Sequence, residues 1–325
     1  FTVLLKEATS DKQIWQYDHD RQNKELSSIP SDIALKIADQ LKAFLTDTEK
    51  QSIQKITTSN QEAYIKYSQG KSYFRRGRNK QDLNTALNLY KESIDLDPDF
   101  AIAYTALSRC YMNLYWFRYD HSQLPLIESE KAIETALRID PDLPEAYIAK
   151  ADYYYHGLLE YSKALEQLQI ASKYVSNHSE ISLLSALVYR RMGKWDTAIE
   201  EFENAYKGDP TNLRIVGNMG ETYAFTGKYQ IGIDYFDKYL ILEPDNAECY
   251  GLKLHLNLLM DGNTVKARKV IEEAAMNNIS PYVISIDALY TPPFMLDVYD
   301  GNYQEALDFL YTTDWEGQMD VMQYY

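Results

Sequence analysis

The side chains best able to do chemistry in this 325-residue chain are its histidines and cysteines, and their spacing argues against a metal site. The histidines are His19, His121, His156, His178 and His255. They form neither an HExxH pair nor a Cys/His cluster with zinc-ligand spacing. The sequence also lacks GxxxxGK(S/T), GxGxxG and GxSxG, the motifs of phosphate loops, dinucleotide sites and nucleophile elbows. It therefore predicts no catalytic, cofactor-binding or metal-binding residue in this segment.

The two cysteines, Cys110 and Cys249, are far apart and lie in apolar helical stretches. We expect each to be a small buried hydrophobic residue, which suits a reducing compartment and predicts a cytoplasmic protein. Apolar runs fall short of the roughly 18 residues that a membrane helix needs, and a secretory signal is missing from the given sequence. The sequence therefore predicts no membrane association.

The excess of acidic over basic residues excludes some classes of binding partner. The formal net charge is −15 and the sequence pI is about 4.8. Proteins that bind nucleic acid or anionic membranes carry clustered positive charge. The composition thus argues against nucleic acid and membrane partners and is compatible with neutral or basic ones.

Four stretches could bind rather than catalyse. Arg75–Lys80 is a basic cluster that could dock an acidic partner or a phosphate, or lie solvated in a loop. Tyr111–Tyr119 is unusually aromatic and could face a ligand, or pack on its own insertion. Tyr153–Tyr155 is expected to place one tyrosine in the core and the others toward a groove. Arg190–Arg191 could face a partner, or form surface salt bridges with neighbouring Glu residues.

The elements that position these residues repeat every 34 residues. Pro210 and Pro244 have this spacing, and so do Phe202 and Phe236. A period of this length, with a small residue, an aromatic residue and a proline at fixed offsets, is typical of stacked helix–turn–helix repeats. Seven repeats can be phased, the fourth over 179–212 and the fifth over 213–246 without insertions. Pro292-Pro293 is expected to break the first helix of the seventh.

Small residues mark where the two helices of each repeat should cross. These positions are Gly70, Ser108, Ala151, Ala186 and Gly220 in first helices, and Ala198 and Gly232 in second helices. A larger side chain there would push the helices apart, at a cost of about 1–3 kcal/mol. Gly193 and Gly227 suit the left-handed residue of the turn between helices.

On these residues the chain resembles the tetratricopeptide repeat family, over about residues 62–311. The resemblance implies a right-handed superhelix of antiparallel helix pairs, an all-α solenoid whose concave face binds peptides or partner proteins. Insertions around Arg75–Lys80 and Trp116–Pro125 depart from the family pattern. By family phasing, the concave groove would be lined by Tyr67, Lys71, Phe74, Arg75, Arg109, Met112, Asp152, Tyr155, His156, Leu187, Arg190, Arg191, Glu221, Phe225 and His255.

The N-terminal segment has a different pattern. Alternation over residues 1–17 predicts a β-hairpin, and Ile33, Ile37, Leu41 and Leu45 predict a helix. Capping boxes at 46–49 and 59–62 predict a short linking helix and the start of the array. Phe1–Ala8, Ile14-Trp15, Tyr17-Asp18 and Ile29–Leu41 resemble the end of a bacterial TolB-like domain. That domain often precedes such repeats behind a class III nucleotide cyclase, a kinase or a DNA-binding transcription regulator.

We therefore expect a domain remnant at 1–45, a linking helix at 46–61 and the repeats at 62–325. Since Phe1 is not a start residue and the chain opens within a pattern, we expect a piece of a longer protein.

The sequence predicts a non-enzymatic scaffold, the regulatory segment of a bacterial signalling protein, that binds a protein segment in its groove. The alternative is a small-ligand sensor that acts on an attached domain. Reversing Arg190 and Arg191 is expected to weaken partner binding with little change in melting temperature. The edge strand near Phe1–Leu5 predicts pairing with a second copy, and hence a homodimer.

Overall fold

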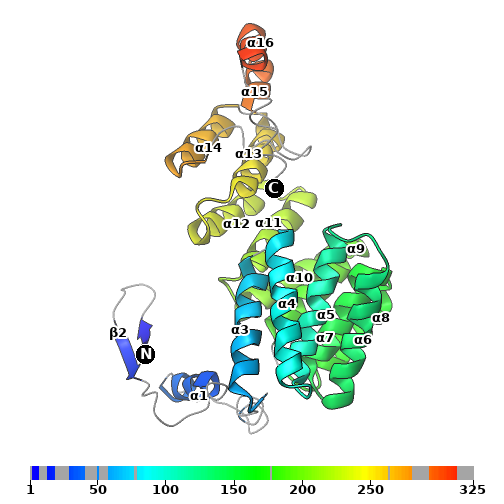
Figure 1. Cartoon of the computed structure of the whole chain (residues 1–325). Coiled ribbons are helices and arrows are strands. Elements are labelled where there is room, and N and C mark those ends of the chain that lie inside the picture. Colours follow the sequence, from blue (N-terminus) through cyan, green and yellow to red (C-terminus); the bar gives the residue numbers. More distant parts are fainter. Residues whose placement is uncertain are drawn as a thin grey trace. The chain divides into compact units, whose positions relative to one another are not determined.

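The computed structural model describes residues 2–6, 13–18, 29–40, 50, 58–76, 79–175, 178–262, 264–279 and 293–312. Most of these residues are helical (Figure 1), which confirms the all-α prediction. The chain forms two compact units, residues 1–177 (unit 1) and 178–325 (unit 2). Each unit contains its own helix pairs and its own buried clusters.

The predicted hairpin is present at the N-terminus. Strands β1 (Thr2–Lys6) and β2 (Gln13–Asp18) pair antiparallel, with Thr2 opposite Asp18. Helix α1 (Ile29–Gln40) follows, as the spacing of Ile33 and Ile37 predicts. The rest of that pattern, Leu41 and Leu45, and the capping box at 46–49 lie outside the described residues.

Three repeats follow in unit 1, and the first two are plain pairs of helices. The helices are α3 (Gln61–Arg76), α4 (Lys80–Leu96), α5 (Ala101–Trp116), α6 (Leu124–Ile139), α7 (Pro144–Asp152) and α8 (Tyr161–Ala171). In the third repeat a π-helical segment, η2 (Tyr153–Leu158), continues α7 before α8 begins. That one repeat therefore departs from the regular geometry of the others.

Four further pairs form unit 2. Their helices are α9 (Ser179–Arg191), α10 (Trp195–Gly208), α11 (Leu213–Phe225), α12 (Tyr229–Leu242), α13 (Ala247–Asp261), α14 (Thr264–Met276), α15 (Pro293–Tyr299) and α16 (Tyr303–Thr312). Helix α15 begins at Pro293 and has only seven residues. The predicted break at Pro292-Pro293 falls at this start, but residues 280–292 lie outside the described residues.

The small residues lie where the paired helices touch. A Cβ atom on Gly70 would lie 2.7 Å from the ring of Tyr90, and one on Gly220 would lie 2.6 Å from the ring of Phe236. Both rings are almost completely buried. The 34-residue pattern therefore identified the contact that sets the distance between paired helices in both units.

The turns between paired helices use a left-handed residue. Gly193 and Gly227 have φ of 73° and 76°, as predicted. At the same place in the third repeat, Leu159 has φ of 56°, directly after η2. A residue with a Cβ is strained there by roughly 1–2 kcal/mol, so the irregular repeat also carries backbone strain.

The start of the array differs by one residue from the prediction. The box at 59–62 assigns the cap to Ser59, whereas Oδ1 of Asn60 accepts the backbone N–H groups of Glu62 and Ala63. The Nδ2 group of Asn60 also donates to the carbonyl of Leu96, at 2.7 Å. Because Asn60 bonds to both helices of the repeat, it is the better cap, and the helix begins at Gln61.

Candidate binding surfaces

One face of α3 is open and hollowed. Seven side chains at helical spacing line a hollow of about 470 Å³, and we call this set the α3 face: Tyr64, Tyr67, Ser68, Lys71, Ser72, Arg75 and Arg76. The opposite side of α3 is fixed by the burial of Ala63 and by the contact of Gly70 with Tyr90. An amphipathic helix buries one side and leaves the other exposed to solvent. The sequence of α3 therefore determines which side chains are accessible to a ligand.

The tyrosine end of the α3 face is held rigidly. The ring centroid of Tyr67 lies 5.2 Å from that of Phe100 and 6.0 Å from that of Tyr90. Burial, helped by the nearby charge of Glu145, raises the pKa of Tyr67 to about 12. The phenol is therefore neutral over the physiological range and can donate a hydrogen bond.

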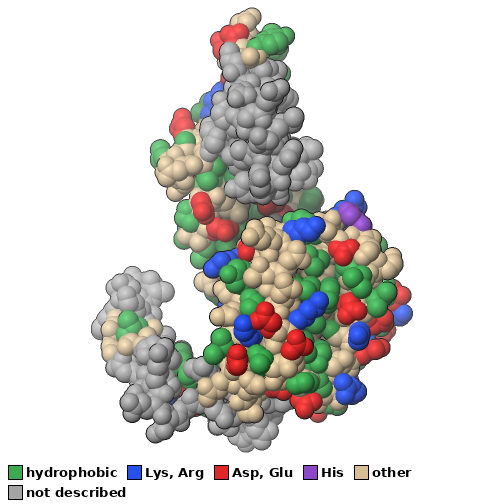
Figure 2. Space-filling model, viewed as in Figure 1, with side chains coloured by type: hydrophobic (Ala, Val, Ile, Leu, Met, Phe, Trp, Pro, Cys, Tyr) green, Lys and Arg blue, Asp and Glu red, His purple; other side chains and the backbone are tan. Residues whose placement is uncertain are grey.

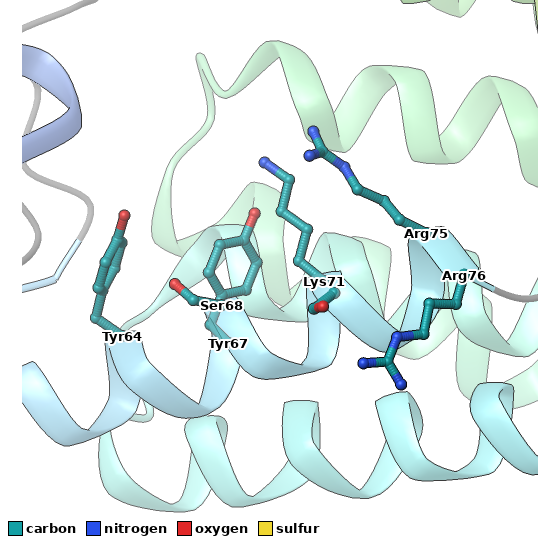
Figure 3. A pocket seen from close by; sticks show the side chains of 7 residues that line it. Tyr64, Tyr67, Ser68, Lys71, Arg75 and Arg76 are labelled. Atoms are coloured by element: carbon teal, nitrogen blue, oxygen red, sulfur yellow. The ribbon is translucent and has the colours of Figure 1, made fainter. Parts of the chain in front are cut away.

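The other end of the α3 face is cationic. Lys71, Arg75 and Arg76 are exposed, and the α3 face contains no carboxylate. Figure 3 shows Lys71 and Arg75 projecting from the same side of α3 as Tyr67. The guanidinium of Arg76 lies 5.0 Å from the ring centroid of Tyr73, and a cation over an aromatic face is held in place.

Helix α5 adds a fourth cation beside this end. The guanidinium of Arg109 lies 5.6 Å from the ring centroid of Phe74 on α3. The structure thus brings together five of the predicted groove residues, Tyr67, Lys71, Phe74, Arg75 and Arg109. Elsewhere on the visible face of unit 1, acidic and basic side chains are interspersed (Figure 2).

Three other predicted groove residues of unit 1 are buried together. Nδ1 of His156 lies 2.9 Å from a carboxylate oxygen of Asp152, and both side chains are less than a tenth exposed. The His156 ring packs on Trp116 at 4.4 Å and on Tyr155 at 4.3 Å. In this conformation these side chains build the core of the irregular repeat and do not line an open surface.

The same cluster decides between the alternatives for the aromatic stretches. Tyr111 is buried and Trp116 packs on the third repeat, so Tyr111–Tyr119 contributes mainly to packing. Tyr153 and Tyr155 are both buried, which corrects the expectation of a single core tyrosine in that triplet. Met112 is likewise fully buried.

In unit 2, Arg190 forms hydrogen bonds and an ion pair with the next repeat. Its guanidinium donates to Oδ1 of Asn218 at 2.8 Å and to Oγ1 of Thr222 at 3.1 Å, and it pairs with Glu221 at 3.4 Å. The side chain is 14% exposed and lies over the Phe202 ring. Salt-bridge formation, the alternative left open for Arg190, is what the structure shows.

The remaining predicted positions of unit 2 are of mixed character. Arg191 is exposed, Leu187 is buried, and burial lowers the pKa of the half-buried His255. Phe225 is 68% exposed, and its ring lies 6.3 Å from that of Trp195, which is 37% exposed. An exposed aromatic pair of this kind is a second surface suited to contact a partner.

The structure adds residues that the groove prediction lacked. Tyr64, Ser68, Ser72 and Arg76 join the α3 face, and Trp195 joins Phe225. A spacing of three or four residues from Tyr67, Lys71 or Arg75 was the available signal for Tyr64, Ser68 and Ser72, and Arg76 is four residues from Ser72. Within the described residues, no cluster of three or more His, Cys, Asp or Glu side chains could hold a metal ion.

In the described part of the chain, a helix with the length and apolar character required to cross a membrane is not found.

Residues 157–212 match the family model described as tetratricopeptide repeat. Superkiller protein 3 of Schizosaccharomyces pombe is 23% identical over 196 residues, which cover 57% of this chain and only 13% of that protein. The crystal structure of a thermophilic TPR protein from Thermus thermophilus has a TM-score of 0.51 at 17% identity, over 60% of this chain and 99% of that one.

A structure of IFIT1 with Gppp-AAAA has a TM-score of 0.55 at 16% identity, over 87% of this chain and 60% of that one. These solved structures support the fold alone. Together with the family model they support the tetratricopeptide repeat resemblance of the array. The TolB-like resemblance of the N-terminal segment stays a prediction.

Proposed function

We propose that this chain is a non-catalytic scaffold that binds a segment of a partner protein through its first helices. The observation that carries the proposal is the open α3 face, where tyrosine, serine and cationic side chains line a hollow beside a rigid packed core. Proteins built from these repeats generally serve as interaction scaffolds. Arg and Tyr side chains on a preorganised support are typical of binding hot spots.

Site-specific photo-crosslinking tests the proposal. A photoreactive amino acid in place of Ser68 stands on the α3 face, and one in place of Asn88 stands on an exposed part of α4. We expect one recurrent partner segment to crosslink from position 68 and not from position 88, and the isolated segment to bind in solution. Equal crosslinking from both positions would reject the α3 face as the binding surface.

We further propose that the segment regulates an attached output domain in a bacterial signalling protein, such as a nucleotide cyclase or transcription regulator. The support is the hairpin of β1 and β2 followed by α1, the order of elements that the TolB-like resemblance implies. Activity of the longer protein with and without residues 62–325 would test this. Unchanged output would reject it.

A small-ligand sensor is the second candidate, because a hollow of about 470 Å³ falls within the size range of small-molecule sites. A ligand that binds only the folded state stabilises it by an amount that grows with the logarithm of the ligand concentration above Kd, and so raises the melting temperature. A thermal-shift screen of metabolites, repeated on Lys71→Ala, therefore separates the two candidates. A hit that Lys71→Ala abolishes favours the sensor.

A further inference from the structure

The α3 face is not uniform along its length. Its N-terminal half presents the rings of Tyr64 and Tyr67, and its C-terminal half presents the cations of Lys71, Arg75 and Arg76. Ser68 lies between Tyr67 and Lys71 along the helix, and Ser72 lies between Lys71 and Arg75. A ligand that satisfies this surface must therefore have two chemically different ends.

The surroundings fix which end is which. At Tyr67 the charge of Glu145 on α7 is opposed by the charges of Arg109 and Arg75, so the tyrosine end, unlike the other end, is not purely cationic. At the other end, Arg109 of α5 adds positive charge beside Phe74. Arg75 and Arg76 also lie in the last turn of α3, where the helix dipole favours cations and holds them in place.

The length of the surface sets the size of the ligand. From Tyr64 to Arg76 the helix advances twelve residues, or about 18 Å at 1.5 Å per residue. An extended peptide rises about 3.3 Å per residue, so about five or six residues span the α3 face. Hydroxyl groups of Tyr67, Ser68 and Ser72 can bond the peptide backbone between the two ends.

We propose that the α3 face binds a short extended segment of a partner protein that is apolar at one end and acidic at the other. The apolar side chain lies against the tyrosines, and two carboxylates lie against the cations. The segment is recognised through internal side chains and needs no free chain terminus. This inference rests on the proposed scaffold function and specifies the chemistry of its partner.

Blocked synthetic peptides test it. The probe is a labelled peptide with an acetylated N-terminus and an amidated C-terminus, in which Phe-Leu is separated by Ser-Ser from Asp-Asp. A second probe has the reverse order, and a third has Asn for each Asp. We expect one of the acidic probes to bind the full chain in fluorescence anisotropy, and the Asn probe to bind at least about tenfold more weakly.

Two variants locate the site. Arg75→Glu combined with Arg76→Glu should weaken binding by about tenfold or more, while Lys131→Glu combined with Lys173→Glu, on exposed positions outside α3, should not. Both pairs change the net charge by the same amount, so the control separates local from overall charge. The single variant Arg75→Glu leaves the contact between Arg76 and Tyr73 in place and guards against a folding defect.

Three results would overturn the inference. They are the absence of binding by both acidic probes, equal weakening by the two double variants, and undiminished binding of the Asn probe. If crosslinking from position 68 identifies a partner segment without acidic residues, the scaffold function stands and this inference fails. If crosslinking identifies nothing and the probes do not bind, both fail.

Discussion

Arg75 of unit 1 and Arg190 of unit 2 both lie in the last turn of the first helix of their repeat, each followed by a second arginine. Arg75 is exposed and lines a hollow, whereas Arg190 is only 14% exposed and bonds to the next repeat. The difference comes from the helix that follows. Helix α11 offers Arg190 three acceptor side chains, while α5 brings another cation, Arg109, toward α3. Of these two arginines, the one that bonds to the next helix is largely covered, and the other is exposed.

The net charges of the two units also differ. Unit 1 contains 22 Lys and Arg against 25 Asp and Glu, and unit 2 contains 11 against 23. Nearly all of the acidic excess of the chain therefore belongs to unit 2. An overall charge of −15 conceals a unit that is almost neutral and carries a cationic face. The net charge of the whole chain is therefore a poor guide to the partners of unit 1.

The largest expected effect comes from the packing contact that the two units share. Gly220→Val should lower the free energy of unfolding by about 3 kcal/mol, because the added side chain collides with the buried ring of Phe236. Gly70→Val should do the same through Tyr90. Urea unfolding gives the size of the loss, and hydrogen exchange shows which unit is loosened.

The control for this prediction is Gly217→Ala, also on α11. Its added Cβ would lie 3.3 Å from the Tyr239 ring, and alanine favours the helix by up to about 1 kcal/mol. Its stability should therefore change little. A Gly220→Val protein as stable as Gly217→Ala would show that the helix pairs do not depend on this contact.

The second effect tests the difference between the two arginines directly. Arg190→Ala should lower the free energy of unfolding by about 2 kcal/mol, because it leaves Asn218 and Thr222 without their charged donor. Arg75→Ala should change it by less than about 0.5 kcal/mol, as is usual for an exposed position. Urea midpoints of the two variants measure the contrast. Equal midpoints would show that the two arginines contribute alike to stability.

The contacts of Arg190 argue against the expectation that reversing Arg190 and Arg191 leaves the melting temperature nearly unchanged. A glutamate at position 190 would face Glu221 and lose the bonds to α11. A loss of partner binding in that double variant would therefore not distinguish contact from unfolding. Arg75 and Arg76 are the informative pair.

The third effect concerns an ion-pair cluster of unit 2. Lys253 is 11% exposed, and its ammonium lies 2.8 Å from Asp237 and 2.5 Å from Glu273. Lys253→Met leaves the two half-exposed carboxylates without their cation, at a cost of about 1 kcal/mol after solvent screening. In unit 1, Lys66→Met breaks the more exposed pair with Glu92 and should cost less. The two urea midpoints check the order.

The pH dependence of this cluster has a definite sign. Burial alone lowers the pKa of Lys253, but the hydrogen bonds and charges of Asp237 and Glu273 outweigh it and raise the pKa above 10.5. A raised folded-state pKa stabilises the fold fully below the unfolded value. The contribution is therefore lost only as the pH rises beyond about 10.5.

The 34-residue period predicted most of the fold, because the same small residue, aromatic residue and turn glycine recur with it. Gly220 with Phe236 and the turn at Gly227 follow from that pattern alone. The pattern did not predict the hydrogen bonds of Arg190, because its acceptors lie on another helix, 28 to 32 residues further along the sequence. The pattern also did not predict the π-helical segment η2. The buried pair of Asp152 and His156 depends on how this one irregular repeat packs.

The smallest effect is a pH dependence that also belongs to unit 2. Burial lowers the pKa of His255 from 6.5, so the folded state disfavours its charged form. The unfolded chain takes up the proton first as the pH falls below 6.5, and stability is lost from there down to the folded-state pKa. We expect His255→Gln to flatten this part of the stability curve in urea titrations at pH 5 to 7, and His121→Gln, at an exposed position of unit 1, to leave it unchanged. If the two variants give the same dependence of stability on pH, the burial of His255 does not make the stability of unit 2 depend on pH.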